Sequence, residues 1–166
     1  MEYFDVIEKR FSCRSFKDEK IDRALLNKVL EAGRLAPTAC NYQPERIFVC
    51  ESEEVLSKLK VATRYTFDAK TILIICHLKS ESWHRGNDGV DHGKVDSTIV
   101  ATQMVLASTA LGLGTCFVCS FKEALVKEVL GINDDYEVDI ILPIGYPNDI
   151  KPHNQRKDLK EIVCYK

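Results

Sequence analysis

The 166-residue sequence lacks the features that mark several large classes of protein. It has no run of about 18 apolar residues and no N-terminal signal peptide, so we expect neither a membrane-spanning nor a secreted chain but a cytoplasmic one. No sign of charge dominates, because 23 Lys and Arg stand against 25 Asp and Glu. We therefore expect neither nucleic acid nor a membrane surface as the main partner.

The cysteines do not form the pattern of a disulfide framework. There are seven, an odd number, spread over core-like strands and polar loops, which indicates reduced thiols. Cys116 and Cys119 spell C-x-x-C before a predicted helix, which leaves a redox dithiol as an alternative. The residues between them are Phe and Val in a predicted strand, so the two sulfurs should lie on opposite faces. Core or pocket-lining cysteines are the favoured interpretation.

No metal site is predicted. His84, Asp88, Asp91 and His92 share the loop "SWHRGNDGVDHG", but their spacing matches no tetrahedral pattern, and a solvated Gly-rich loop is the simpler interpretation. His77 lies in an apolar segment and is expected to be structural. We also find no arrangement typical of a nucleophilic triad or a general acid/base pair.

The hydrophobic pattern predicts helices alternating with strands, without a repeat or linker that would split the chain. Helices are expected over 3–10, over 22–35 with Asp22 as N-cap, from Ser52 to Ala62, over 94–111, and from a capping box at Ser120 and Glu123 to Gly131. Strands are expected over 46–50, 71–78, 115–119 and 138–147. This order does not repeat βαβ units, so the predicted class is α+β, with a mixed or antiparallel sheet flanked by helices in a single domain, 1–166.

The predicted helix over 94–111 has apolar and small residues nearly all the way round. Such a helix should be buried on most sides. A domain of this length rarely encloses it alone, so the pattern indicates a subunit interface.

Three stretches carry candidate ligand-binding groups. In "RFSCRSF", Arg10, Ser12 and Arg14 stand at every second position, so an extended backbone would turn two guanidiniums and a hydroxyl toward one anion. The alternative is a solvated basic face. A second small basic pair, Arg156 and Lys157, lies in the charged tail and taken alone suggests only solvation.

The third stretch, "RLAPTACNYQPERIF", follows a predicted helix with two prolines around small and amide residues. Each proline favours extended backbone in the residue before it. Such a segment is either a simple turn or a surface that presents backbone amides and an Asn side chain to a planar ligand.

Together these pieces resemble a known family. "RFSCRSF", "EAGRLAPTACNYQP", "ALGLGTCFVCSF", "ILPIGYP" and "RKDLKEIV" follow the order and spacing of the flavin-dependent nitroreductase-like proteins in their short form. Each piece is weak alone, but five in register are specific, and the resemblance covers about residues 3–163. It implies a nitroreductase-like α+β homodimer with one FMN in each of two interface sites.

The resemblance assigns roles to the residues that match. It implies FMN phosphate and ribityl ligands at Arg10, Ser12 and Arg14, with Arg156 and Lys157 closing on the phosphate, and guanidiniums match a phosphate dianion well. It also implies that Pro37, Thr38 and Ala39 pack on the flavin ring from the partner subunit, that Asn41 and Gln43 offer amides to its polar edge, and that Val118, Cys119 and Ser120 face the ring. The catalytic chemistry is expected from FMN alone, with Cys119 as a candidate modulator.

Two departures from the family pattern stand out. Glu45 follows "QP", where many members carry an aromatic residue, and Cys119 occupies a position where Gly or Glu is more usual. The loop over 80–93 is expected to border the open face of the flavin, which makes Trp83 and His84 candidate substrate contacts.

The implied activity is that of an FMN-dependent oxidoreductase. Electrons would pass from NAD(P)H to a nitroaromatic, quinone or similar electrophilic acceptor in a ping-pong cycle. Two alternatives stay open: a non-catalytic FMN-binding or redox-sensing module, and an enzyme that fragments its flavin. The sequence does not identify the physiological acceptor or choose between NADH and NADPH.

Overall fold

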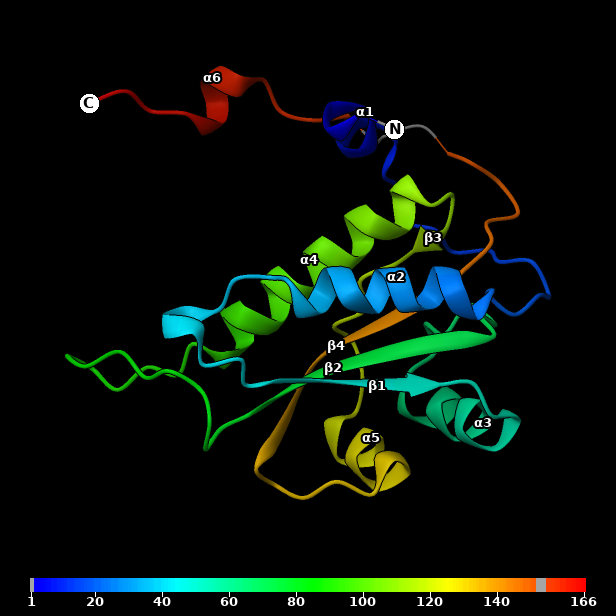
Figure 1. Cartoon of the computed structure of the whole chain (residues 1–166), viewed down its shortest axis with the longest axis horizontal. Coiled ribbons are helices and arrows are strands. Elements are labelled where there is room, and N and C mark those ends of the chain that lie inside the picture. Colours follow the sequence, from blue (N-terminus) through cyan, green and yellow to red (C-terminus); the bar gives the residue numbers. More distant parts are fainter. Residues whose placement is uncertain (1, 152–154) are drawn as a thin grey trace.

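The computed structural model describes residues 2–151 and 155–166. Within them lies a four-stranded sheet in the order β1-β2-β4-β3, with every neighbouring pair antiparallel (Figure 1). The strands are β1 (Glu45–Cys50), β2 (Thr71–Leu78), β3 (Gly114–Thr115) and β4 (Tyr136–Gly145). The helices are α1 (Tyr3–Lys9), α2 (Arg23–Arg34), the 3₁₀ turn η1 (Ala39–Asn41), α3 (Glu53–Ala62), α4 (Gly93–Ala110), α5 (Glu123–Leu130) and α6 (Leu159–Ile162). The predicted α+β class is confirmed, and the sheet is antiparallel.

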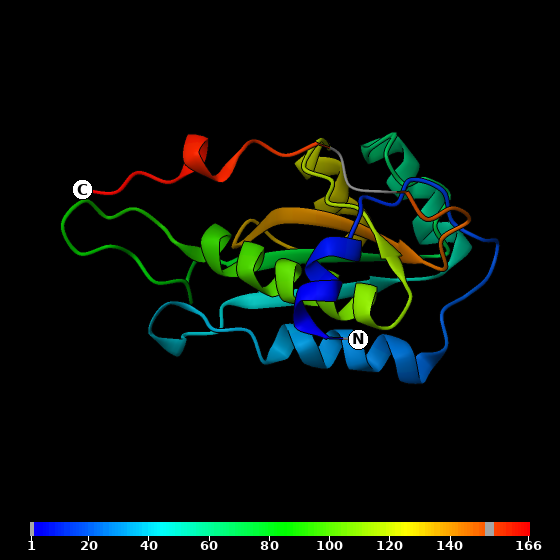
Figure 2. The ribbon, with the colours of Figure 1, turned by 90° about the horizontal axis from the view of Figure 1, so that it is seen from above.

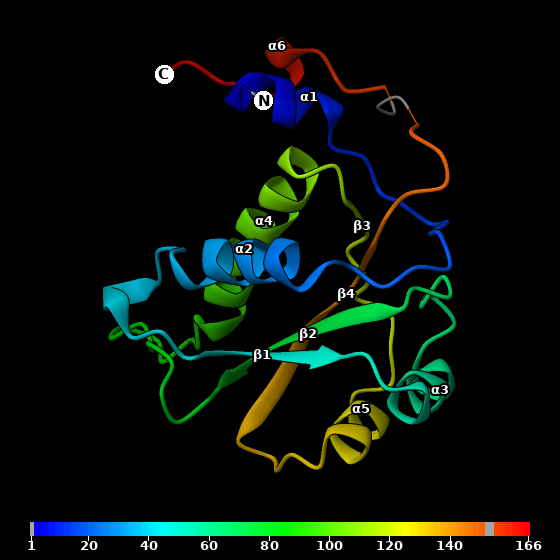
Figure 3. The ribbon, with the colours of Figure 1, turned by 45° about the vertical axis from the view of Figure 1, so that its right-hand side comes forward.

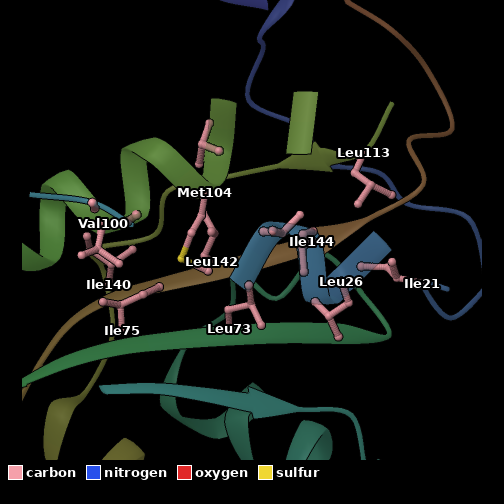
Figure 4. Close-up of a cluster of buried hydrophobic side chains, with 14 residues drawn as sticks. Ile21, Leu26, Leu73, Ile75, Val100, Met104, Leu113, Ile140, Leu142 and Ile144 are labelled. Atoms are coloured by element: carbon pink, nitrogen blue, oxygen red, sulfur yellow. The ribbon is translucent and has the colours of Figure 1, made fainter. Parts of the chain in front are cut away.

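Helices cover both faces of the sheet, and the alternation along β2 shows why. Leu73 and Ile75 point into a buried cluster with α2 and α4, which Figure 4 shows in close-up. Ile72 and Ile74 point the opposite way, into a cluster with α3 and α5. A strand buried on both faces needs an unbroken apolar run, which is what "TILIIC" supplies. Figure 2 shows α2 on the side of the sheet away from α3 and α5.

The predicted caps of two helices are confirmed. Asp22 Oδ1 accepts hydrogen bonds from the N–H groups of Ala24 (2.8 Å) and Leu25 (3.2 Å) at the start of α2. Ser52 Oγ accepts one from Val55 N–H (3.3 Å) at the start of α3. These bonds satisfy amides that the first helical turn leaves without partners. Gly131, with φ of 66°, ends α5 as predicted.

The predicted capping box at Ser120 is wrong. Helix α5 begins only at Glu123, and its N-cap is Lys122, whose side chain makes no capping hydrogen bond. Both members of the expected box have other partners. The Ser120 carbonyl accepts a hydrogen bond from Thr63 Oγ1 (2.7 Å), and Glu123 Oε1 accepts one from Val138 N–H (3.3 Å).

The strand predicted over 115–119 is also shorter than expected. Strand β3 ends at Thr115, and beyond it Cys116 N–H still donates to the Pro143 carbonyl (3.3 Å) while Val118 forms an isolated bridge with Ile141. The register would place Cys116 opposite Pro143, which has no N–H to donate, so the ladder breaks there. The side chains still alternate: Cys116 is buried and Cys119 exposed, which confirms that the C-x-x-C sulfurs point to opposite sides.

Helix α4 is only partly buried within one chain. Its inner face packs into the core, but Val95 and Ile99 are 50% and 36% exposed. A groove of about 610 Å³ runs between α1, α2 and α4, and its lining includes Tyr3, Ile99 and Leu106. Figure 3 shows α1 lying across the end of α4. The open face fits the predicted subunit interface, and the dimer itself stays a prediction. Among the described residues, no helix combines the length and apolar character needed to cross a bilayer.

Candidate active site

The segment that carries Arg10, Ser12 and Arg14 runs beside β3. Ser12 forms a parallel bridge with Thr115, and Cys13 N–H donates to the Thr115 carbonyl (2.9 Å). The backbone is therefore extended there, as predicted. Cys13 turns inward and is buried, whereas Arg14 is exposed. This pairing brings the arginines next to the segment that follows β3.

A small pocket of about 220 Å³ lies where these two segments meet. It is lined by Arg14, Tyr65, Phe67 and residues 116–120. Tyr65 and Phe67 were not predicted from the sequence. They follow α3, and their rings lie 6.1 Å apart with an interplanar angle of 47°. The only available signal was the pair of aromatic residues at i and i+2 in "RYTF", which a planar ligand can contact.

The pocket has a positive electrostatic character. Arg14 has one weak hydrogen bond, from Nη1 to the Ser12 carbonyl at 3.4 Å, and neither Arg10 nor Arg14 pairs with a carboxylate within the described part of the chain. Burial raises the pKa of the Cys116 thiol, and the charges of Arg14 and Arg10 oppose that rise. Both guanidiniums therefore act on the same small region, where an anion would be stabilised.

The segment after β3 offers backbone donors to this pocket. The amides of Cys116, Val118 and Lys122 donate to carbonyls of the fold, but those of Cys119 and Ser120 have no acceptor among residues 2–151 and 155–166. Val118 lines the pocket but is only 4% exposed, because its side chain packs mostly in the core. The predicted contact of Val118 with the flavin stays a prediction. Cys119 is exposed and lies four residues before α5, so it does not stand directly before the helix as the predicted cap at Ser120 implied.

The segment over 37–43 is a tight turn. Cys40, Asn41 and Gln43 have φ of 51°, 56° and 53°, in the left-handed region that few non-glycine residues adopt. The extended backbone predicted for Gln43 before Pro44 is therefore wrong. The turn is held from within, because Gln43 N–H donates to Thr38 Oγ1 (3.1 Å) and Gln43 Nε2 donates to the Asn41 carbonyl (3.0 Å).

This turn is tied to the start of α4. Ala39 N–H donates to Asp96 Oδ1 (2.9 Å), and Asp96 is 1% exposed. Sequence reasoning missed Asp96, since a lone acid in a helix gave no sign of this role. Thr38 and Ala39 are half-buried, whereas Pro37 and Asn41 are exposed and accessible to a ligand. Strained backbone of this kind is common at ligand sites.

Within one chain, the turn does not join the arginine pocket. None of residues 37–43 lines that pocket. Figure 1 shows η1 and the loop before α4 at one end of the molecule, away from β3. The family resemblance places residues 37–39 in the site of the partner subunit, and the separation within one chain is consistent with that arrangement.

The loop over 80–93 is solvated as predicted, with residues 84–90 exposed, and it forms a hairpin. His84 bridges Asp91, Arg85 N–H donates to the Val90 carbonyl (2.9 Å), and His92 N–H donates to the Trp83 carbonyl (3.0 Å). Trp83 packs edge-on against His92 with ring centroids 5.0 Å apart, and His84 is about half exposed. In the described part of the chain, no group of His, Cys, Asp and Glu is placed to hold a metal ion.

The tail residues are not brought to the pocket in this structure. Arg156 and Lys157 are exposed, precede α6, and make no hydrogen bond or ion pair with the described residues. Their predicted contact with a phosphate stays a prediction.

Comparison with known proteins gives a consistent result. The sequence profile of the Nitroreductase family matches residues 7–68 and 61–146. The crystal structure of a nitroreductase family protein from Clostridium difficile 630 is 35% identical, with a TM-score of 0.95 over 100% of this chain and 99% of the other. A protein of Archaeoglobus fulgidus, named as an NADH dehydrogenase/NAD(P)H nitroreductase, is 27% identical over 95% of this chain and 92% of its own length. A chain from Desulfovibrio desulfuricans, solved in complex with FMN, is 22% identical, covers 100% and 97% of the two chains, and has a TM-score of 0.88.

Proposed function

Because this chain belongs to the nitroreductase family, we propose that it is an FMN-dependent oxidoreductase that passes electrons from NAD(P)H to an electrophilic acceptor. Nitroaromatics and quinones are the acceptor classes proposed, in a ping-pong cycle. The observation that carries the proposal is the pocket in which Arg14 meets the amides of Cys119 and Ser120, since none of these groups has a carboxylate or carbonyl partner for its charge or N–H within the described residues beyond the weak bond of Arg14 to Ser12. The names of the relatives from A. fulgidus and D. desulfuricans agree with a nicotinamide donor and with FMN.

The residues present fit FMN in charge and in hydrogen-bonding groups. Arg10 and Arg14 supply forked, permanently charged donors for a phosphate, and Ser12 adds a hydroxyl between them. The N–H groups of Cys119 and Ser120 can donate to the polar edge of the ring. Arg156 and Lys157 would close on the phosphate from the tail.

The second half of the site would come from another copy of the chain. The turn over 37–43 lies outside the arginine pocket of its own chain, so a homodimer is needed to place Pro37, Thr38 and Ala39 against the ring. Asn41 and Gln43 would then offer amides at its edge. The Gln43 Nε2 atom is already bonded to the Asn41 carbonyl, which leaves its Oε1 to accept a hydrogen bond.

When bound, FMN supplies the redox chemistry, taking hydride from NAD(P)H and returning electrons to the acceptor. The protein binds and orients the reactants. Arg10 and Arg14 hold the anionic end, the Cys119 and Ser120 amides favour electron density at the ring edge, and Trp83 and His84 contact the acceptor at the open face. No side chain is required to transfer a proton at a fixed site, and Cys119 is proposed to line the pocket.

An anaerobic titration tests this function directly. The purified protein should be yellow, should bleach on addition of NADH or NADPH, and should regain its colour when a quinone or nitroaromatic is added. Arg14→Ala, reconstituted at the same FMN concentration, is the matched control. It should retain less FMN if the cofactor binds through this pocket. Absence of bleaching with both nucleotides would refute the oxidoreductase and support a flavin-binding or redox-sensing module. Irreversible loss of colour under oxygen would instead indicate flavin fragmentation.

A further inference from the structure

A β-bulge on β4 places a buried carboxylate beside a buried histidine. Ile75 pairs with Ile140 and Cys76 pairs with Val138, so Asp139 is the extra residue between two registers. A bulge re-aims the side chain of its extra residue. Asp139 is 3% exposed, and its Oδ2 lies 2.8 Å from His77 Nδ1 on β2.

His77 faces a second carboxylate with its other ring nitrogen. Its Nε2 lies 3.4 Å from Asp91 Oδ2, at the base of the hairpin over 80–93. The imidazole is 2% exposed, and Nε2 makes no hydrogen bond among the described residues, so its contact with Asp91 is an ion-pair distance only. The ring also packs on Gly93, where an added Cβ would lie 2.2 Å from it. His77 thus stands between the sheet and the hairpin with no room to turn away.

Asp91 connects this histidine to both arms of the hairpin. Its Oδ1 accepts a hydrogen bond from Gly93 N–H (2.8 Å) at the start of α4. Its Oδ2, which faces His77, also lies 3.8 Å from His84 Nε2 on the outgoing arm. A chain of alternating acid and imidazole therefore runs from the sheet to the residues next to Trp83.

The charges around His77 favour its protonated form. Burial opposes protonation, but the hydrogen bond and charge of Asp139 and the charges of Asp91 and Glu137 outweigh it, so the pKa of His77 is raised above 6.5. Glu45 on β1 stands directly across from His77 in the strand register and adds a carboxylate on that side. Across the site, burial opposes ionisation of Asp91, yet hydrogen bonds from Ser82 and Gly93 and the charges of His77 and His84 lower its pKa.

We infer that His77 is a positioning residue. Asp139 holds its ring on one side, and on the other side the ring binds Asp91. This contact fixes the hairpin that carries Trp83 and His84. The contribution to acceptor binding rests on the proposed function, whereas the fixing of the hairpin does not. An imidazolium between two carboxylates bonds both, and a neutral ring with one N–H can donate to only one of them. The hairpin is therefore held most firmly when His77 is charged. The link is fully present below pH 6.5 and is lost as the pH rises through the raised pKa of His77.

The single tryptophan of the sequence makes the hairpin directly observable. Trp83 is the only one, so quenching of its fluorescence by acrylamide reports exposure of the hairpin at equal flavin content. In the wild type, quenching should increase with pH, with a midpoint above 6.5. Asp91→Asn keeps an oxygen for Gly93 N–H but removes the charge, so quenching at pH 6 should rise about twofold or more and the midpoint should fall. Asp88→Asn, in the same hairpin but paired with Arg85, is the matched control and should behave like the wild type.

Two further variants separate positioning from general destabilisation. His77→Asn keeps a donor for Asp139 but is too short to reach Asp91, so it should abolish the pH transition of quenching. In the double variant with Asp91→Asn, quenching of Trp83 should not rise above that of Asp91→Asn alone. His92→Gln removes the ring that touches Trp83 and should leave the midpoint in place. The inference would be overturned if Asp91→Asn had the same quenching profile as the wild type. It would also be overturned if the pH midpoint of quenching shifted in His92→Gln instead of in Asp91→Asn.

Kinetics test the consequence for the reaction. In Asp91→Asn the KM for the acceptor should rise about fivefold while kcat changes less than about twofold, because binding at the open face is what the hairpin provides. If Asp91→Asn had wild-type kinetics but altered Trp83 quenching, the role of His77 in acceptor binding would be refuted. Its role in positioning the hairpin would still be supported. If the wild type reduces no acceptor, the proposed function fails, but the fluorescence result still decides whether His77 fixes the hairpin.

Discussion

Arg14→Ala should weaken FMN binding much more than riboflavin binding. Riboflavin has the same ring and ribityl chain but no phosphate, so the difference isolates the anion contact. Arg14 is exposed, and among residues 2–151 and 155–166 it has no carboxylate partner and only a 3.4 Å hydrogen bond to the Ser12 carbonyl, so its charge is available to a ligand. Loss of one charge-assisted hydrogen bond costs about 1.5–3 kcal/mol, or about 10- to 150-fold in Kd.

The same geometry limits the side effects of the substitution. Since Arg14 contributes almost nothing to packing, the free energy of unfolding of the apoprotein should change by less than about 0.5 kcal/mol. Flavin fluorescence titrations would give both Kd values, and Lys9→Ala, which removes a charge from the exposed end of α1, is the matched control. Equal losses for FMN and riboflavin, or an equal loss in Lys9→Ala, would refute the assignment of Arg14 to the phosphate.

Three further predictions concern packing, assembly and the pocket thiol. Gly93→Ala should destabilise the fold by about 1–3 kcal/mol in chemical denaturation, because its Cβ would lie 2.2 Å from the His77 ring. The control Gly86→Ala should be close to neutral, since its Cβ would have no atom of the described residues within 4 Å. Similar denaturation midpoints for the two variants would contradict this prediction. Ile99→Lys on the open face of α4 should shift sedimentation from dimer to monomer, and a wild-type chain that sediments as a flavin-loaded monomer at micromolar concentration would exclude the dimer. Cys119→Ser should keep FMN and most NAD(P)H oxidation, so a rate loss of about tenfold, or about 1.4 kcal/mol of barrier, would move this thiol into the mechanism.

Much of the fold could be predicted because its signals are local. The cap at Asp22, the continuous apolar run of β2 and the left-handed Gly131 each depend on a few neighbouring residues. Predictions failed where a distant residue decided the outcome. Ser120 does not cap α5, since the helix begins only at Glu123 and the Ser120 segment is bonded to the distant Thr63. The strand after β3 stops because Pro143 across from it lacks an N–H.

The candidate site divides in the same way. The placement of Arg10, Ser12 and Arg14 on one face of an extended segment could be predicted, because side chains along extended backbone alternate with a period of two. The placement of Arg14 in one pocket with Tyr65 and Phe67 could not be predicted, since about 50 residues separate them and only the fold brings them to the same site.

The sequence by itself determined the elements and the residue types of a family site, because hydrophobic period, capping residues and short motifs act over a few positions. The tertiary structure decided which of those groups meet. The bulge that turns Asp139 toward His77 arises from a register shift between two strands, which no local pattern records. The burial of that pair and its link to Asp91 depend on both faces of the sheet being covered and on α4 starting at Gly93. Charge interactions depend on distance and burial in three dimensions, so the sequence predicted only a structural histidine where the fold places His77 between two carboxylates.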